Sequence, residues 1–442
     1  MAFGKLFKRL LGVSEKAAIS DDPFGSHPPR KVASPAVPII HEQAAIVQRD
    51  EILDSHSRIA GYRFTVQKLD SNKLPDTALT ISALRADNLA IFAERRLALV
   101  PLTIENWKDG DFQQFIAPNT TFLVSTPSTG SSSVDWIQTI QEIKAAGGRV
   151  ALDDAGATNP AAMTIANLML LDFRSYSLEN LERLAKRVIA SHPSLSLAVD
   201  GISTWPEHRL CQSWGVRYSL GGFATANDEE DKSDKLNQSR LVLLEMLNLL
   251  RCGADLSRVS EVSKRDPGVA VKIVEMANSP IMGLTSHVAS LEQAMMVLGR
   301  ETLYRWLSVS MFRTGNTSGR DAALLELALW RAHFLELLAS EIRPKQECDE
   351  LFLVGLLSLL DILFGMSMDH ALKKMNLPEV VTEVLLKSAG PYAQFLMLTM
   401  AMEKGRGEQV VRIAADLGIA PEKLEQHSGS ARIWVEAALN LG

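Results

Sequence analysis

The sequence predicts two domains of different fold class, an α/β domain built as a trimmed βα barrel and an all-α domain after it. Between about residues 45 and 226, short apolar runs alternate with runs of helical periodicity, which is the pattern of a parallel sheet covered by helices. From residue 236 onward, helical periodicity continues without a strand-like run. A length of 442 residues also exceeds what a single hydrophobic core usually holds.

Composition and charge exclude several functional classes. With 46% hydrophobic and 22% charged residues, the chain can bury a core. Its formal net charge of -6 gives no general attraction to phosphate backbones, so we expect no nucleic-acid partner. Cys211, Cys252 and Cys348 lie far apart, which argues against a disulfide framework and a thiolate zinc site. No apolar stretch reaches the roughly 20 residues of a membrane-spanning helix, so we expect a cytoplasmic protein.

Residues 1–16 have the pattern of a short basic amphipathic helix. The apolar positions that recur at helical spacing are Phe3, Leu6, Phe7, Leu10 and Leu11. Three interpretations stay open: a weak peripheral anchor at the inner face of the membrane, a docking helix for a protein partner, and a frayed terminus. The proline-rich residues 17–44 predict a flexible tether, and the charged residues 227–235 predict a linker between the domains.

The first domain, residues 45–226, is predicted to open with a hairpin over residues 51–64. Apolar runs then predict strands at residues 97–102, 121–125, 149–152, 168–173, 195–199 and 216–220. Helical runs such as 134–146 and 178–191 lie between them, and this repeated order indicates a barrel. About 180 residues are fewer than the roughly 250 of a typical eight-stranded βα barrel, which predicts a trimmed or open form.

Four aspartates fall at or just after the carboxyl ends of predicted strands: Asp153, Asp154, Asp172 and Asp200. The active sites of βα barrels lie at this end, and carboxylates grouped there could hold a divalent cation. For the adjacent pair, we favour a structural role in which the two side chains cap or turn the chain before Gly156.

The first domain resembles the EAL-type cyclic di-GMP phosphodiesterases in its segments ILDSHSRIAGYRF, LDDAGATN, VDGIST and LGGF. This resemblance implies a site for phosphodiester hydrolysis at two metal ions, which needs oxygen ligands around both ions. At the corresponding positions, the expected polar groups of the family are replaced by Arg63, Pro101, Val124, Leu170, Ser203 and Leu220. The family's paired aspartates remain as Asp153 and Asp154, Asp172 is kept, and a glutamate is shortened to Asp200. The resemblance therefore implies a degenerate EAL-like domain.

The second domain, residues 236–442, resembles the HDOD family of bacterial signalling domains. The segments that carry this resemblance are SKRDPGVAVKIVEMANSP, SLEQAMMVLGRETLYRWLS and FLVGLLSLLDILFG. HDOD domains are related to metal-dependent HD phosphohydrolases, whose signature is a His-Asp pair. Here the corresponding place is taken by Ser358 and Leu359, and no His-Asp dipeptide occurs in the sequence.

Together, the two resemblances imply a bacterial signal-transduction regulator. We expect a scaffold or adaptor that binds other signalling proteins through its HDOD domain, with no enzymatic activity, no metal and no cofactor. Two alternatives stay open. One is a cyclic di-GMP receptor that uses the retained aspartates without hydrolysis, and the other is an active cyclic di-GMP phosphodiesterase.

Overall fold

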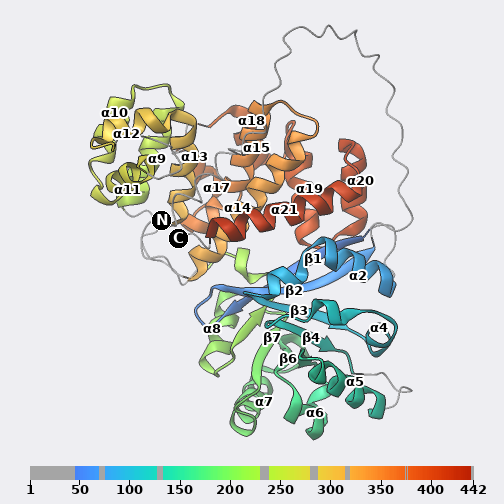
Figure 1. Ribbon diagram of the computed structural model, residues 1–442. Helices are drawn as coiled ribbons and strands as arrows, with labels where there is room; N and C mark the ends of the chain where they lie inside the picture. Colours follow the sequence, from blue (N-terminus) through green and yellow to red (C-terminus); the bar gives the residue numbers. More distant parts are fainter. Residues whose placement is uncertain are drawn as a thin grey trace, which may run out of the picture.

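The computed structural model describes residues 45–68, 75–126, 133–228, 238–278, 287–313, 319–373, 375 and 377–439. In these residues, a closed eight-stranded barrel is followed by a helical domain (Figure 1), which confirms the predicted pairing of an α/β barrel with an all-α domain. The basic segment 1–16, the tether 17–44 and most of the linker 227–235 lie outside the described residues.

The barrel strands follow one another in sequence order around the sheet. They are β1 (Ala45–Asp54), β2 (Ile59–Lys68), β3 (Leu97–Leu102), β4 (Thr120–Val124), β5 (Arg149–Leu152), β6 (Leu168–Asp172), β7 (Ser196–Asp200) and β8 (Tyr218–Leu220). Strand β1 is antiparallel to both β2 and β8, and the other neighbours pair in parallel. On β1, Ile52 is the register partner of Gly61 on one side and of Leu220 on the other, which closes the barrel.

Helices cover the outside of the barrel between its strands. They are α2 (Thr77–Ala86), α3 (Leu89–Ala93), α4 (Ile104–Asp109), α5 (Ser133–Ala145), α6 (Pro160–Ile165), α7 (Leu178–Ser191) and α8 (Trp205–Ser213). Local sequence explains where several begin. Thr204 and Glu207 form a capping box at the start of α8, and Asn159 caps α6 ahead of Pro160.

Apolar side chains fill the inside of the barrel. This inner cluster consists of Ile52, Leu97, Leu99, Ala151, Leu168, Leu170, Ala198 and Leu220. The alternation of strand side chains sends the next residues outward into the larger cluster beneath the helices. Position 61 requires glycine, because a Cβ atom there would lie 1.9 Å from the carbonyl oxygen of Leu97. The barrel is therefore a packed core, and only its ends are open to a ligand.

The second domain contains helices only, in the part of it that the structure describes. They are α9 (Gln238–Arg251), α10 (Leu256–Ser263), α11 (Pro267–Ala277), α12 (Leu291–Leu298), α13 (Arg300–Arg313), α14 (Gly319–Ser340), α15 (Lys345–Leu357), α16 (Leu360–Phe364), α17 (Met368–Leu372), α18 (Glu379–Lys387), α19 (Ala393–Glu403), α20 (Gly407–Leu417) and α21 (Pro421–Leu439). Helices α14 and α15 are buried along most of their length and form the centre of the domain. Among the described residues, no helix combines the length and the apolar character needed to cross a membrane.

The helical domain lies directly on the β1–β2 hairpin (Figure 1), and one continuous hydrophobic cluster runs through both domains. Helices α14, α19 and α21 make the contacts with the hairpin. At the centre of the interface, the hydroxyl group of Tyr62 donates to Glu326 Oε1 (2.6 Å), and Arg96 donates to both oxygens of the same carboxylate (2.5 and 2.8 Å). A buried and fully bonded charge at this place fixes how the two domains sit together.

Candidate functional site

The four predicted aspartates lie at one end of the barrel, along three neighbouring strands. Asp172 and Asp200 are register partners at the ends of β6 and β7. The backbone N–H of Asp172 donates to Asp154 Oδ2 (3.2 Å), which joins β6 to the loop after β5. Asp153 lies next to Asp154 in that loop. This end of the barrel, called the mouth below, is where βα barrels carry their chemistry.

Asp153 is engaged by the backbone and a side chain around it. Its Oδ1 accepts hydrogen bonds from the Thr126 hydroxyl (2.5 Å) and the Gly156 N–H (2.9 Å), and its Oδ2 accepts from the Thr126 N–H (3.1 Å). These bonds tie the loop after β4 to the turn that begins at Gly156. The geometry is that of a side chain that organises a turn.

Asp154 differs from its neighbour, because one of its oxygens has no partner. Its Oδ1 is buried and accepts no hydrogen bond from the described residues. Burial raises the pKa of the Asp154 carboxyl, and the Asp172 carboxylate raises it too, while hydrogen bonds from the Asp172 backbone and the Tyr176 side chain act in the opposite direction. Asp154 thus combines a buried carboxylate oxygen that accepts no hydrogen bond from the described residues with a carboxyl group whose pKa is raised by burial.

Arg63 enters the mouth from β2 and is held by two carboxylates. Its Nε donates to Asp50 Oδ2 (2.9 Å), and its Nη1 donates to Asp200 Oδ2. Burial alone would lower the pKa of Arg63, but the charges of Asp200 and Asp50 outweigh burial and raise it. The guanidinium group therefore stays charged and joins β1, β2 and β7 across the mouth.

The other replaced positions lie on the barrel wall or beside it. Leu170 and Leu220 belong to the inner cluster, and Pro101 is the register partner of Leu123. On β4, Leu123 packs against the inner cluster, whereas Val124 packs in the outer one. Ser203 lies beyond β7, where its hydroxyl oxygen accepts from Arg174 Nη2 (3.3 Å).

The mouth does not fit the two-metal site that an EAL-type resemblance implies. Among the described residues, no group of three or more His, Cys, Asp or Glu side chains is arranged to hold a metal ion. Asp200 is paired with a guanidinium cation, and Asp153 is bonded to its own loop. Ions held about 3.5 to 4 Å apart need several free carboxylate oxygens around both of them.

In the helical domain, Ser358 and Leu359 lie at the end of α15, and Leu359 is buried. The hydroxyl oxygen of Ser358 accepts from Arg331 Nη1 (3.0 Å). Arg331 also donates to both oxygens of Glu403 (2.7 Å each). Burial raises the pKa of nearby Asp361, and the charge of Arg331 partly opposes that rise. The position that corresponds to the His-Asp pair of the HD phosphohydrolases therefore lies beside a buried ion pair between Arg331 and Glu403.

Two cavities that the sequence did not indicate lie on the helical domain, and Arg305 lines both of them. The first, of about 320 Å³, lies between the end of α9, α13 and α15. The second, of about 370 Å³, lies between α13, α14 and the start of α15. Arg305 donates to Glu336 (2.5 Å) and Asp349 (3.2 Å) and stacks on Phe352. The only signal in the sequence was a charged residue among the apolar positions of a predicted helix.

Comparison with known families decides the nature of the helical domain, because residues 241–377 match the family model described as the HDOD domain. This segment is an HDOD domain. The predicted HDOD resemblance is therefore confirmed. Helices α18, α19, α20 and α21 follow the matched segment, and α19 and α21 contact the barrel.

Two known proteins are similar to this chain over much of its length. The cyclic di-GMP phosphodiesterase CdgJ of Vibrio cholerae serotype O1 is 22% identical over 321 residues, which cover 72% of this chain and 74% of CdgJ. The uncharacterized protein YuxH of Bacillus subtilis (strain 168) is 25% identical over 280 residues, which cover 60% of this chain and 67% of YuxH.

Solved structures with similarity to this chain include two bound to cyclic di-GMP. The YkuI protein of Bacillus subtilis, which has an EAL domain and was solved with cyclic di-GMP and calcium, is 11% identical, with a TM-score of 0.31. BlrP1 of Klebsiella pneumoniae, solved with manganese and cyclic di-GMP, is 11% identical, with a TM-score of 0.34. The matches cover 40% and 42% of this chain, and 54% and 56% of the respective solved chains.

The comparisons contradict one expectation from the sequence. From the replaced residues we expected no enzymatic activity, but a relative that matches 72% of this chain is named a cyclic di-GMP phosphodiesterase. The expectation that this chain has no enzymatic activity is therefore overturned as a conclusion from the sequence. The expectation depended on matching single positions to a family pattern, and a shift of one residue in a strand exchanges an inward for an outward side chain. On β4, for example, Leu123 rather than Val124 packs against the inner cluster.

Proposed function

We propose that this chain is a signal-transduction regulator that binds other signalling proteins through its HDOD domain. In this proposal, the barrel holds the HDOD domain in one fixed orientation. The observation that carries the proposal is the pair of cavities beside Arg305. Two hollows of several hundred Å³ that share Arg305 in their linings give a partner segment places to insert side chains.

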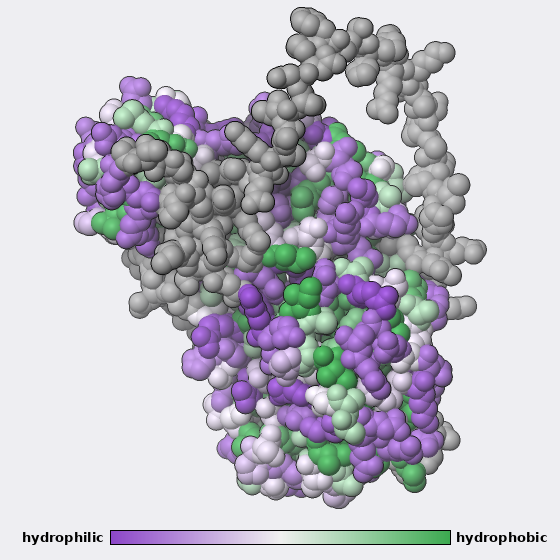
Figure 2. Space-filling view, in the orientation of Figure 1, coloured by the Kyte–Doolittle hydropathy of each residue, from purple (hydrophilic) through white to green (hydrophobic). Residues whose placement is uncertain are grey.

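The first cavity has a lining suited to a protein segment. Leu250 and Leu353 supply apolar surface, and burial raises the pKa of the Tyr304 hydroxyl to about 12, so that it stays a neutral donor. Arg251 and Glu301 line the same cavity and bring charges of both signs. Apolar surface combined with charged groups is the composition of a non-obligate protein interface. Over the face of the molecule that Figure 2 shows, hydrophobic residues are scattered among hydrophilic ones.

The contacts between the domains support a rigid mounting. Tyr62 and Arg96 of the barrel share the Glu326 carboxylate of α14, and Gly405 lies close to Gln48 of β1. An interface with buried, bonded charges and a shared apolar core keeps one relative orientation. A partner bound to the HDOD domain would therefore be held at a fixed place relative to the mouth.

Charge reversal in the first cavity tests this proposal. We would tag the full chain, recover it from its native cells and compare the bound proteins for the wild type, for Arg251→Glu and for the matched control Arg258→Glu on α10. Arg251 and Arg258 are both exposed, but only Arg251 lines the cavity. We expect at least one partner to be lost at least tenfold from Arg251→Glu alone. Identical sets of partners in all three samples would contradict the proposal.

A second candidate function is action on cyclic di-GMP, which the relationship to CdgJ favours. Cyclic di-GMP is an anion, and the mouth contains more aspartates than arginines, so binding there would need a cation to compensate the charge. The test is isothermal titration with cyclic di-GMP in Ca²⁺, together with an assay for linear pGpG in Mg²⁺ or Mn²⁺. Micromolar binding that Asp154→Asn abolishes would support a receptor, and pGpG formation would support a phosphodiesterase. The absence of both would exclude this candidate.

A further inference from the structure

A small cavity lies between the two domains, where α14 and α21 meet the β1–β2 hairpin (Figure 1). Both domains contribute to its lining, which consists of Arg49, Tyr62, Glu326, Trp330, Arg432, Val435 and Glu436. Its volume is about 10 Å³. One water molecule needs roughly 10 to 15 Å³, whereas sites for organic ligands measure roughly 300 to 1,000 Å³. The cavity therefore has the size for a single water molecule.

Three buried polar atoms of this lining have no hydrogen-bond partner among the described residues. They are Trp330 Nε1, Arg432 Nε and Glu436 Oε1. The two nitrogens are N–H donors, and the carboxyl oxygen is an acceptor. A buried donor or acceptor that is left without a partner is destabilising, so most such groups bond to protein or to ordered water.

The three side chains are held close together. Arg432 Cζ lies 4.6 Å from the ring centroid of Trp330 and 5.5 Å from that of Tyr62. Glu436 follows Arg432 by four residues on α21, which places both side chains on one face of the helix. The donors of α14 and α21 and the acceptor of α21 thus meet at one place.

Other polar groups of the lining are already bonded. The Tyr62 hydroxyl donates to Glu326 Oε1 (2.6 Å), and Arg49 Nε donates to Asp87 Oδ2 (2.8 Å). These groups surround the cavity without needing a further partner. The unmet hydrogen bonds are those of the three atoms on α14 and α21.

We propose that this cavity binds one ordered water molecule, which accepts from Trp330 Nε1 and Arg432 Nε and donates to Glu436 Oε1. Three hydrogen bonds are typical of a buried water molecule. A bridging water is nearly as favourable in enthalpy as a direct hydrogen bond. The water joins α14 to α21 beside the hairpin and so helps to hold the helical domain in its orientation on the barrel.

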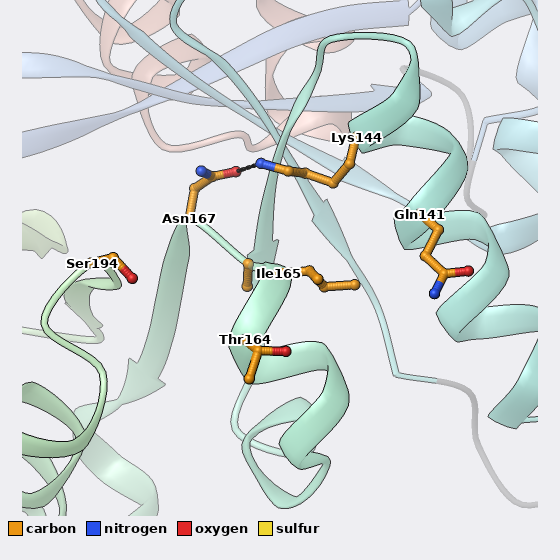
Figure 3. Close-up of a pocket in the computed structure, with 7 residues that line it drawn as sticks. Gln141, Lys144, Thr164, Ile165, Asn167 and Ser194 are labelled. Carbon is orange, nitrogen blue, oxygen red and sulfur yellow. Dashed lines mark hydrogen bonds between the residues drawn. The ribbon is translucent and has the colours of Figure 1, made fainter.

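A larger hollow at the amino ends of β6 and β7, of about 390 Å³, lacks this property (Figure 3). Its lysine, Lys144, donates to Asn167 Oδ1 (3.0 Å), and that oxygen also accepts from the Val150 N–H (3.0 Å). Gln141 and Ser194 lie on opposite sides of it. Volume alone therefore does not indicate a ligand, whereas buried atoms without partners do.

The test uses the full chain in two measurements. The first is a crystal structure at high enough resolution to place internal water molecules. The second is the nuclear Overhauser effect between water and the tryptophan indole N–H protons in solution, with Trp330→Phe to assign the Trp330 signal. Trp205 is the internal control, because it is also buried but its Nε1 donates to the Ala226 carbonyl oxygen (3.1 Å). The crystal structure separates a bound water from a signal relayed through the Tyr62 hydroxyl.

We expect density for one water molecule within hydrogen-bond distance of Trp330 Nε1, Arg432 Nε and Glu436 Oε1. In solution, the Trp330 indole proton should show a water signal with the sign of a molecule that tumbles with the protein, and Trp205 should not. Glu436→Leu removes the acceptor and should weaken the Trp330 signal severalfold. The matched control Glu422→Leu, at an exposed position of the same helix, should leave it unchanged.

A cavity without water density, or a water signal no stronger at Trp330 than at Trp205, would overturn the proposal. An undiminished Trp330 signal in Glu436→Leu would overturn the bonding described for Glu436. These outcomes do not depend on the proposed function, because the linings of the two HDOD cavities share no residue with this one.

Discussion

Asp50 and Glu51 are neighbours on β1, and their side chains face opposite sides of the barrel wall. Asp50 accepts from Arg63 inside the mouth, whereas Glu51 lies among charged groups of the helical domain that include Glu403 and Arg432. Alternation along a strand places consecutive side chains on opposite faces. A single stretch of β1 therefore connects the mouth with the HDOD-containing domain.

The stability of the protein should fall as pH rises through the neutral range. Burial raises the pKa of Glu51 to about 7, the Glu403 and Asp50 charges add to that rise, and the Arg432 charge opposes it. Burial also raises the pKa of Glu425 to about 8, with a further contribution from Asp87. A carboxyl group whose folded pKa lies above its unfolded value stabilises the protein at low pH and loses that contribution as pH rises through the folded pKa.

The measurement is urea denaturation between pH 5.5 and 9. We expect the free energy of unfolding to decrease between about pH 6 and pH 8 and to level off above that, and we expect Glu51→Gln to reduce the part of this decrease that lies below about pH 7. Burial lowers the pKa of His208 from 6.5 to about 4, so His208 adds stability as pH rises but only up to about pH 6.5, and it does not contribute above that pH. A free energy of unfolding that is constant or rises from pH 6 to pH 9 would show that these carboxyl groups are not buried as described.

Removing Arg63 should destabilise the barrel because it leaves two carboxylates facing each other. Arg63 and its partners Asp50 and Asp200 are each about one-quarter exposed, so the loss should be smaller than the 3 to 5 kcal/mol of a fully buried pair. We expect Arg63→Leu to cost about 1 to 3 kcal/mol in urea denaturation. Adding Asp50→Asn and Asp200→Asn should recover most of the loss, and a triple variant as unstable as the single one would contradict this electrostatic account.

The sequence predicted the strands of the barrel well because parallel strands buried on both faces are continuous apolar runs. The runs at residues 97–102 and 149–152 coincide with β3 and β5. The hairpin was expected, but the closure of β1 onto β8 was not, since nothing local in the sequence specifies a pairing between Ile52 and Leu220. Closure is a tertiary event that depends on the summed twist of the sheet.

The sites were less predictable than the strands. The acidic residues of the mouth could be predicted, because they lie at the carboxyl ends of apolar runs that are recognisable as strands. The ion pairs of Arg63 could not be predicted, because they depend on which face of β2 and β7 points inward. The contact between Tyr62 and Glu326 joins residues 264 positions apart, and no periodicity encodes such a contact. The cavities beside Arg305 are lined by residues of separate helices, so no motif marked them.

Gly61→Ala should prevent normal closure of the barrel. The new Cβ would lie 1.9 Å from the Leu97 carbonyl oxygen, an atom of the neighbouring backbone that cannot rotate away. We expect a loss of about 4 kcal/mol or more, or failure to fold. The matched control is Gly222→Ala, where a Cβ would have open space around it and the change should stay within about 1 kcal/mol. Equal melting temperatures for both variants would contradict the described approach of β2 to β3.

Arg331 and Glu403 should prove strongly coupled, because each is the main charge partner of the other inside the helical domain. The pair is mostly buried and bonded through both carboxylate oxygens, and Arg331 also bonds Ser358. Arg331→Met leaves the Glu403 carboxylate without its counter-ion, and Glu403→Gln leaves the guanidinium group without its own. Each single change should cost about 3 kcal/mol in urea denaturation.

The double variant decides whether this cost comes from the pair itself. Removing both charges leaves neither one uncompensated, so the double variant should lose clearly less stability than the sum of the two single variants. We expect the double-mutant cycle to give a coupling free energy of about 1 to 3 kcal/mol. The pair Arg265 and Glu245, which is about half exposed, is the matched control and should show a coupling of less than about 1 kcal/mol. Additive costs for Arg331 and Glu403 would mean that the two side chains do not form the described pair in solution.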